Sequence, residues 1–284
     1  MTDPPRDTVA DVLHRQRRWG EKPLVICDEQ RLSYAEADTG SSALARRLAT
    51  LGVGKGTHVG ILHPNGPRFV IAALAASRIG AVVVPFSTFS TATELRRQLR
   101  DADVAVLLAA KRYRNHDYTT RLDDAVGAHR GVDGALFSTE APVLRHILFG
   151  DDGDDRGGGE PADIAAMEND VDGSDTLAII YTSGSTSDPK GVIHTHGSLI
   201  AHQRNLNEIR GLTDADRLFC NTPFFWIGGF AFGLLATMVA GATLICSDAT
   251  DAAATLDLIE AEKPTLTNGF VAGVAHLALS LIHI

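Results

Sequence analysis

The stretch with the highest density of hydrogen-bonding side chains is residues 181–192, which read Tyr-Thr-Ser-Gly-Ser-Thr-Ser-Asp-Pro-Lys-Gly-Val. Its candidate binding residues are four hydroxyls, one glycine and one cation: Thr182, Ser183, Gly184, Ser185, Thr186 and Lys190. The glycine lets backbone N–H groups turn inward as an anion-binding nest, and the hydroxyls can donate to phosphate oxygens. The lysine adds a mobile positive charge. These residue types predict a polyphosphate-binding loop, with a plain surface turn as the alternative.

The loop differs from the P-loop of nucleotide hydrolases. Counting from Gly184, Pro189 stands where the second glycine would be, and Gly191 follows Lys190 where Ser or Thr is required. The apolar run 177–181 before the loop has the pattern of a buried strand, and the residues after Lys190 return to a strand pattern. The predicted local structure is therefore strand, polar loop, lysine, strand, whereas a P-loop opens a helix.

This string resembles the signature loop of the adenylate-forming acyl-CoA synthetases, whose core reads Thr-Ser-Gly-Ser/Thr-Thr-Gly-x-Pro-Lys-Gly. One position departs from that pattern: Ser187 stands where the family usually has its second glycine. The resemblance covers essentially the whole chain. It implies an α/β fold of stacked βα subdomains with mostly parallel sheets, as in the large N-terminal domain of these enzymes.

The resemblance also implies a reaction, the ATP-dependent activation of a carboxylic acid, expected to be a fatty acid. The carboxylate attacks the α-phosphate of Mg²⁺-bound ATP to give an acyl-adenylate and pyrophosphate, and coenzyme A then takes the acyl group as a thioester. ATP, Mg²⁺ and coenzyme A are thus the expected cofactor and co-substrates. The loop residues would hold the β- and γ-phosphates.

Several family motifs are not found in this sequence, namely the adenine-contacting loop, the ribose-binding aspartate and the C-terminal lobe with its catalytic lysine. We therefore expect an N-terminal portion of a longer enzyme that has no catalytic residue of its own and is inactive alone. Its expected partners are a small carboxylic acid and the missing C-terminal part. Two alternatives stay open: a non-catalytic fragment with weak nucleotide binding at most, and an unrelated nucleotide hydrolase.

A second informative stretch, residues 223–229, reads Pro-Phe-Phe-Trp-Ile-Gly-Gly. Apolar and aromatic runs usually form the core, so core packing is one interpretation. Members of the resembled family carry a proline, aromatic residues and often a histidine here, and these line the acyl-binding pocket. Trp226 stands where that histidine is common, which indicates a bulkier and more apolar wall. By the same resemblance, Gly228 and Gly269 would also border the acyl substrate.

Composition and charge restrict the class of protein. Hydrophobic residues make up 44% of the 284 and charged residues 21%, as in folded globular proteins. The net charge of -9 provides no basic surface for nucleic acid or an anionic membrane. Cys27, Cys220 and Cys246 are odd in number and lack metal-ligand spacing, which favours free thiols in a reducing compartment. Because residues 1–8 also lack a signal-peptide pattern, the expected location is cytoplasmic.

The pattern of hydrophobic residues predicts alternating strands and helices, and hence a parallel sheet. The acidic, glycine-rich residues 150–163 have the composition of a solvated connection. We therefore expect a first α/β subdomain over 1–150, an acidic glycine-rich linker or loop over 151–173, and a truncated second α/β subdomain over 174–284 that carries the phosphate-binding loop. The charged residues 111–136 are expected to form exposed helices.

No charged residue lies between Arg217 and Asp248, a length that could span a bilayer. Polar and turn-forming residues interrupt this segment at 221–223 and at 241–242. The predicted structure is a loop, a buried helix over 229–240 and a strand over 243–246, with a transmembrane helix as the alternative.

Three histidines, His194, His196 and His202, follow the loop closely. Their spacing fits no common zinc site, although a zinc site stays open as the alternative. The resembled family commonly has a histidine or a Thr-His pair here, which favours local support of the phosphate loop.

Overall fold

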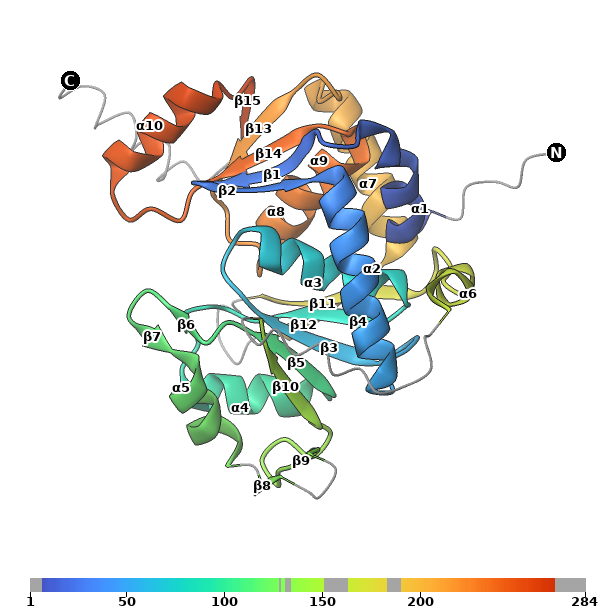
Figure 1. Cartoon of the computed structure of the whole chain (residues 1–284), viewed down its shortest axis with the longest axis vertical. Helices are drawn as coiled ribbons and strands as arrows, with labels where there is room; N and C mark the ends of the chain where they lie inside the picture. Colours follow the sequence, from blue (N-terminus) through green and yellow to red (C-terminus); the bar gives the residue numbers. More distant parts are fainter. Residues whose placement is uncertain (1–6, 128, 131–133, 151–162, 183–189, 269–284) are drawn as a thin grey trace.

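Two β-sheets with a layer of helices between them organise the chain, and further helices cover the outer face of each sheet (Figure 1). The computed structural model describes residues 7–127, 129–130, 134–150, 163–182 and 190–268. Both sheets are parallel apart from one antiparallel strand at an edge of each. This architecture is the expected stack of mostly parallel α/β units.

The upper sheet of Figure 1, here sheet A, has the strand order β15-β13-β14-β1-β2. Its strands are β1 (Pro23–Cys27), β2 (Gln30–Ser33), β13 (Arg217–Cys220), β14 (Thr243–Cys246) and β15 (Leu266–Asn268). The lower sheet, sheet B, has the order β10-β5-β3-β4-β11-β12. Its strands are β3 (His58–Leu62), β4 (Val82–Pro85), β5 (Val106–Ala109), β10 (His146–Phe149), β11 (Thr176–Thr182) and β12 (Lys190–Thr195). Two small antiparallel pairs add β6 (Arg112–Tyr113) with β7 (His116–Asp117) and β8 (His129–Arg130) with β9 (Leu136–Phe137).

The helices form three layers around these sheets. They are α1 (Val9–Gln16), η1 (Arg17–Trp19), α2 (Tyr34–Thr50), α3 (Pro67–Arg78), α4 (Ala92–Asp101), α5 (Tyr118–Val126), α6 (Ile164–Asn169), α7 (His196–Arg210), α8 (Ile227–Gly229), the π-helical segment η2 (Phe230–Leu235), α9 (Ala236–Ala240) and α10 (Ala252–Glu262). Buried side chains of α4 and α5 pack on the outer face of sheet B, and α10 packs on the outer face of sheet A.

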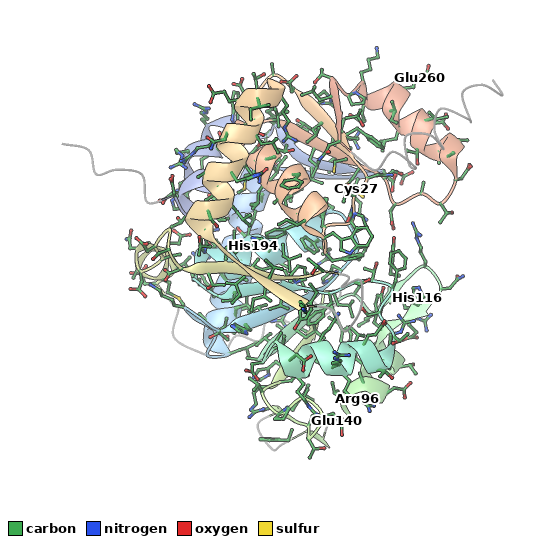
Figure 2. The ribbon with its side chains drawn as sticks, turned by 180° about the vertical axis from the view of Figure 1, so that it is seen from behind. Cys27, Arg96, His116, Glu140, His194 and Glu260 are labelled. Carbon is green, nitrogen blue, oxygen red and sulfur yellow. The ribbon has the colours of Figure 1, made fainter. Side chains whose placement is uncertain are left out.

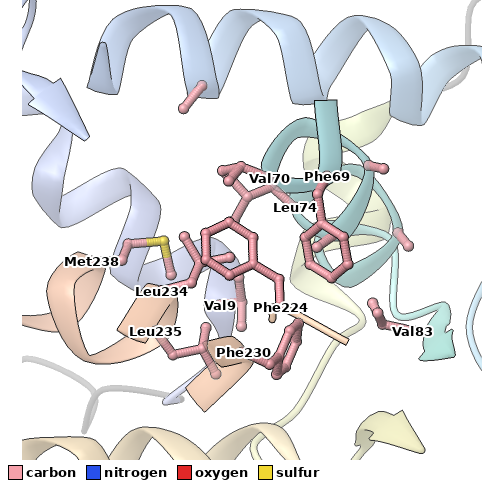
Figure 3. Close-up of a cluster of buried hydrophobic side chains, with 14 of the residues drawn as sticks. Val9, Phe69, Val70, Leu74, Val83, Phe224, Phe230, Leu234, Leu235 and Met238 are labelled. Carbon is pink, nitrogen blue, oxygen red and sulfur yellow. The ribbon is translucent and has the colours of Figure 1, made fainter. Parts of the chain in front are cut away.

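Helix α3 is the centre of the middle layer. It contacts β1 and β2 of sheet A as well as β3 and β4 of sheet B. A helix that is buried on all sides carries small and apolar residues around most of its circumference. This holds for α3, in which nine of the twelve residues are buried. Figure 3 shows Phe69 of α3 beside Phe224 and Phe230 in this core, with the ring centres of Phe69 and Phe224 5.4 Å apart.

A buried arginine links three helices, α2, α3 and α6, at the end of α3. Arg78, at the end of α3, is only 2% exposed, and its guanidinium binds Glu168 of α6 at 2.5 Å and Asp38 of α2 at 3.1 Å. It also donates to the Ser41 hydroxyl at 2.8 Å. Removing a partner from a buried charge is costly, so this network fixes α6 against α2 and α3.

Two helix starts and the uncharged segment show how local sequence signals set the elements. Ser33 with Glu36 and Thr91 with Glu94 form capping boxes at the starts of α2 and α4. The uncharged segment folds as expected into a loop, a buried helical stretch and the strand β14, although β13 at its beginning was not predicted. Within the described part of the chain, no helix is long and apolar enough to cross a membrane.

The charged stretch 111–136 fits its expectation only in part. Its described residues form one helix, α5, and strands of two small hairpins, instead of helices alone.

Both sheets contain strands from before and after residues 151–173. Sheet A joins β1 and β2 to β13–β15, and sheet B joins β3–β5 and β10 to β11 and β12. The division of the chain into subdomains at 151–173 stays a prediction.

Candidate functional site

Strands β11 and β12 form an antiparallel hairpin that carries the hydroxyl-rich loop. Thr182 ends β11, Lys190 begins β12, and the two residues are paired across the hairpin. The Thr182 hydroxyl donates to the Lys190 carbonyl oxygen at 3.4 Å, and both residues are exposed. The strand–loop–lysine–strand prediction is thus confirmed at both ends of the loop. The residues between them, 183–189, lie outside the described part of the chain.

The hairpin opens onto a groove between the two sheets. Parallel strands place their carboxyl ends at one edge, which is where open α/β sheets bind ligands. Three cavities of about 500, 190 and 210 Å³ are lined mainly by residues that follow β1, β3, β4, β5, β13 and β14. The first two cavities share Asn65 and Asp248, and the last two share Phe89 and Phe225. The three cavities therefore adjoin one another, and we call them together the groove.

The 210 Å³ cavity brings the two predicted motifs together. Thr182, from the neck of the loop, and Trp226, from the aromatic stretch, both line it. The loop after β4 supplies Ser87 and Phe89, and α4 supplies Gln98. Burial raises the pKa of Tyr181, another lining residue, so its hydroxyl stays neutral. Glu94 of α4 also lines the cavity, so its walls combine aromatic surface with hydroxyl and amide groups and one carboxylate.

The aromatic wall depends on a tight turn after β13. Trp226 is 42% exposed, and its indole packs edge-on against Phe225 with the ring centres 5.2 Å apart. A Cβ atom on Gly229 would lie 2.2 Å from the Pro223 carbonyl oxygen, so only glycine fits there. Gly228 packs against Thr222 and is not among the residues that line the cavity. Gly269 lies outside the described residues.

The three histidines do not gather into a site. β12 runs away from the loop for six residues at about 3.3 Å each, so His196 lies at its far end. There Nδ1 of His196 accepts a hydrogen bond from the Val9 N–H at 3.1 Å, and burial lowers its pKa to about 4. His202 stacks on Phe232 instead. The expectation that these histidines support the phosphate loop locally is therefore wrong for His196 and His202.

Figure 2 shows, from behind, His194 on β12 and Cys27 at the end of β1. Burial lowers the pKa of His194, so this ring is neutral at neutral pH. Among the described residues, no group of three or more His, Cys, Asp or Glu side chains could hold a metal ion. The three cysteines are free and buried. No described residue is therefore assigned to Mg²⁺ or zinc.

Comparisons with known proteins identify the family. The model of the AMP-binding enzyme family matches residues 12–281, nearly the whole chain. The chain belongs to the AMP-binding enzyme family. One relative is the 3-[(3aS,4S,7aS)-7a-methyl-1,5-dioxo-octahydro-1H-inden-4-yl]propanoyl:CoA ligase of Mycobacterium tuberculosis. It is 32% identical over 92% of this chain and 51% of its own length. The feruloyl-CoA synthase of an Amycolatopsis species is 31% identical over 84% of this chain and 43% of its own.

Solved structures of AMP-binding enzymes share the fold. The crystal structure of a long-chain-fatty-acid-CoA ligase from Archaeoglobus fulgidus matches 99% of this chain and 55% of its own with a TM-score of 0.78, at 23% identity. The chain spans about half the length of the curated relatives it matches. The family resemblance and the fold that the loop predicted are both confirmed.

Proposed function

We propose that this chain forms the phosphate- and acid-binding part of an acid–thiol ligase, an AMP-forming acyl-CoA synthetase. The observation that carries the proposal is the 210 Å³ cavity shared by Thr182 and Trp226. A phosphate-binding loop and an acyl-binding wall must meet at one place, because the carboxylate attacks the α-phosphate directly. The relatives named as CoA ligases support the same reaction class.

Thr182, Lys190 and the loop residues Ser183 to Thr186 would hold the outer phosphates of ATP. Their role is positioning and charge neutralisation, which dominate catalysis of reactions at phosphorus. Lys190 lies at the neck of the loop, where an exposed ammonium can approach the phosphate tail. Mg²⁺ would accompany ATP, coenzyme A would be the acyl acceptor, and no residue is assigned to either. The free cysteines support a cytoplasmic location.

Trp226 and its neighbours would bind the acyl part of the acid. A fatty acid is the substrate we propose first. Relatives are also named for acids that contain rings, such as ferulate and indoleacetate, and the aromatic side chains Phe89, Phe225 and Trp226 could pack against either kind. Gly228 and Gly269 stay in the proposal as residues that would border the acyl substrate.

Carboxylate-dependent exchange of labelled pyrophosphate into ATP tests the proposed function. In a form of the protein extended to the length of its relatives, exchange is expected only when a suitable acid is present. A hydrolase would consume ATP without the acid, and that result would contradict the proposal. The 284-residue chain alone is expected to form no acyl-CoA, because orientation supplies roughly 7 to 11 kcal/mol and half of the relatives' length is absent from it.

A Trp226→Ala variant tests the acyl wall. Because Trp226 lines the cavity and is only partly buried, its removal is expected to shift preference toward bulkier acids while the fold is largely retained. The measurement is kcat/KM for a graded set of acids, together with urea unfolding. Phe137→Ala is the matched control, since Phe137 is an aromatic of similar exposure, at 52%, outside the groove. A loss of roughly 3 to 5 kcal/mol in stability with unchanged acid preference would make Trp226 ordinary core.

A further inference from the structure

Asn65 connects the two sheets at the floor of the groove. It follows β3 of sheet B, and its side-chain amide reaches the turn after β13 of sheet A. Its Oδ1 accepts from the Phe224 N–H at 2.7 Å, and its Nδ2 donates to the Thr222 carbonyl oxygen at 3.1 Å. One planar amide thus satisfies a donor and an acceptor of the same turn. We call this pair of hydrogen bonds the Asn65 clamp.

The clamped turn leads directly into the aromatic wall. The Trp226 N–H donates to the Pro223 carbonyl oxygen at 3.1 Å, inside the clamp. The Trp226 carbonyl oxygen then accepts from the Phe230 N–H at 2.8 Å, which begins the helical stretch. With Gly229 packed against the Pro223 carbonyl, the turn has little room to adjust on that side. A shift of the turn therefore moves Trp226.

The rest of the turn has its own anchors, so the clamp has a specific task. Phe224 is buried against Phe69. Asn221 accepts from the Ser247 N–H at 2.7 Å and ties the turn to the end of β14. Both anchors hold the turn to the core or to its own sheet. The clamp instead reaches it from the end of β3, in the same sheet as β11, which carries Thr182.

From this geometry we infer that Asn65 is a positioning residue: it sets the place of Trp226 relative to Thr182, and so the fit of the acid beside the phosphate loop. The functional part of the inference rests on the proposed function. The amide oxygen and the amide nitrogen each make one hydrogen bond to the turn that leads to Trp226, and through these bonds Asn65 acts on Trp226. Other side chains cannot repeat this pattern at the same length, because aspartate lacks the donor and alanine lacks both groups.

Tryptophan fluorescence tests the positioning without any activity. The chain has two tryptophans, so Trp19→Phe leaves Trp226 as the single reporter in the 284-residue chain. Time-resolved anisotropy then reports nanosecond motion of the indole. In Asn65→Ala and Asn65→Asp, the amplitude of the fast component is expected to rise about twofold as the turn loosens. Glu29→Ala is the matched control, because Glu29 lines the neighbouring cavity and is exposed.

Kinetics of the extended protein test the consequence for the acid. Asn65→Ala is expected to raise KM for the acid about tenfold while KM for ATP stays unchanged, since two hydrogen bonds that place the wall are lost. Equal rises in both KM values, or an indole as rigid in both folded variants as in the parent, would overturn the inference. Circular dichroism verifies folding, and Asn65→Asp decides the matter if Asn65→Ala does not fold. If the parent protein shows no acid-dependent exchange, the proposed function fails, while anisotropy still decides whether Asn65 positions Trp226.

Discussion

Replacing both Thr186 and Lys190 with alanine is expected to weaken the use of ATP by roughly 2 to 4 kcal/mol, because charge-assisted hydrogen bonds to phosphate are lost. Lys190 faces Thr182 across the neck of the loop, and Thr186 belongs to the loop itself. The loss would appear in kcat/KM for ATP in the extended protein. KM for the acid should change little, since the acyl wall is built from the turn after β13.

The control for this variant removes a positive charge elsewhere. Lys263 follows α10, on the outer side of sheet A, and has φ of 49°. Lys263→Asn therefore removes one positive charge, as the double variant does, and leaves a residue that tolerates the left-handed conformation. Adenylation kinetics that respond equally to both changes would reduce the effect to overall charge. Unchanged kinetics in the double variant would remove the phosphate-binding assignment.

The second large effect is a loss of stability in mild acid caused by His196. In the folded chain its pKa is about 4, against 6.5 for an unperturbed histidine, because the ring is fully buried. As the pH falls below about 6.5, the unfolded chain takes up this proton first, so folding stability decreases until about pH 4. The two values imply a loss of about 3 kcal/mol over that interval. Nearby Asp175 and Asp11 oppose the shift and do not reverse it.

A His196→Asn variant isolates this contribution. The asparagine Oδ1 can take over the hydrogen bond from the Val9 N–H and does not titrate. Urea unfolding of both proteins between about pH 7 and pH 4 should show a steeper loss for the parent chain. Parallel pH profiles would mean that His196 is protonated in the folded chain, or that carboxylates alone govern the acid response.

Much of the fold could be predicted because its signals are local. Apolar runs predicted the strands β11 and β14, and capping pairs such as Ser33 with Glu36 stand where helices begin. The strand β13 was missed because its four residues adjoin a polar turn and carry no clear alternation. The arrangement of strands into sheets was not predictable in the same way. It depends on packing between segments far apart in the chain, such as β1 with β14.

The candidate site divides along the same line. Thr182, Lys190 and Trp226 were found because each belongs to a contiguous motif. Asn65 was missed because its two partners are 157 and 159 residues away, and nothing beside it in the sequence indicates them. The preceding Pro64 and the following Gly66 are typical only of a break in the chain. Candidate binding residues can thus be proposed from motifs here, whereas the proposed positioning residue Asn65 required the structure.

Each sheet combines strands from early and late in the sequence, and this affects how the chain folds during synthesis. During synthesis, β1 is made about 200 residues before its parallel partner β14, which is some 10 to 40 s at about 5 to 20 residues per second. Sheet B receives β11 and β12 before β13 and β14 exist, so it can assemble earlier. Until then the edge of β1 that faces away from β2 has no partner strand, and this open edge can bind a chaperone or pair wrongly. During synthesis, sheet A therefore cannot be completed before sheet B, because its strands β13, β14 and β15 are made after β11 and β12.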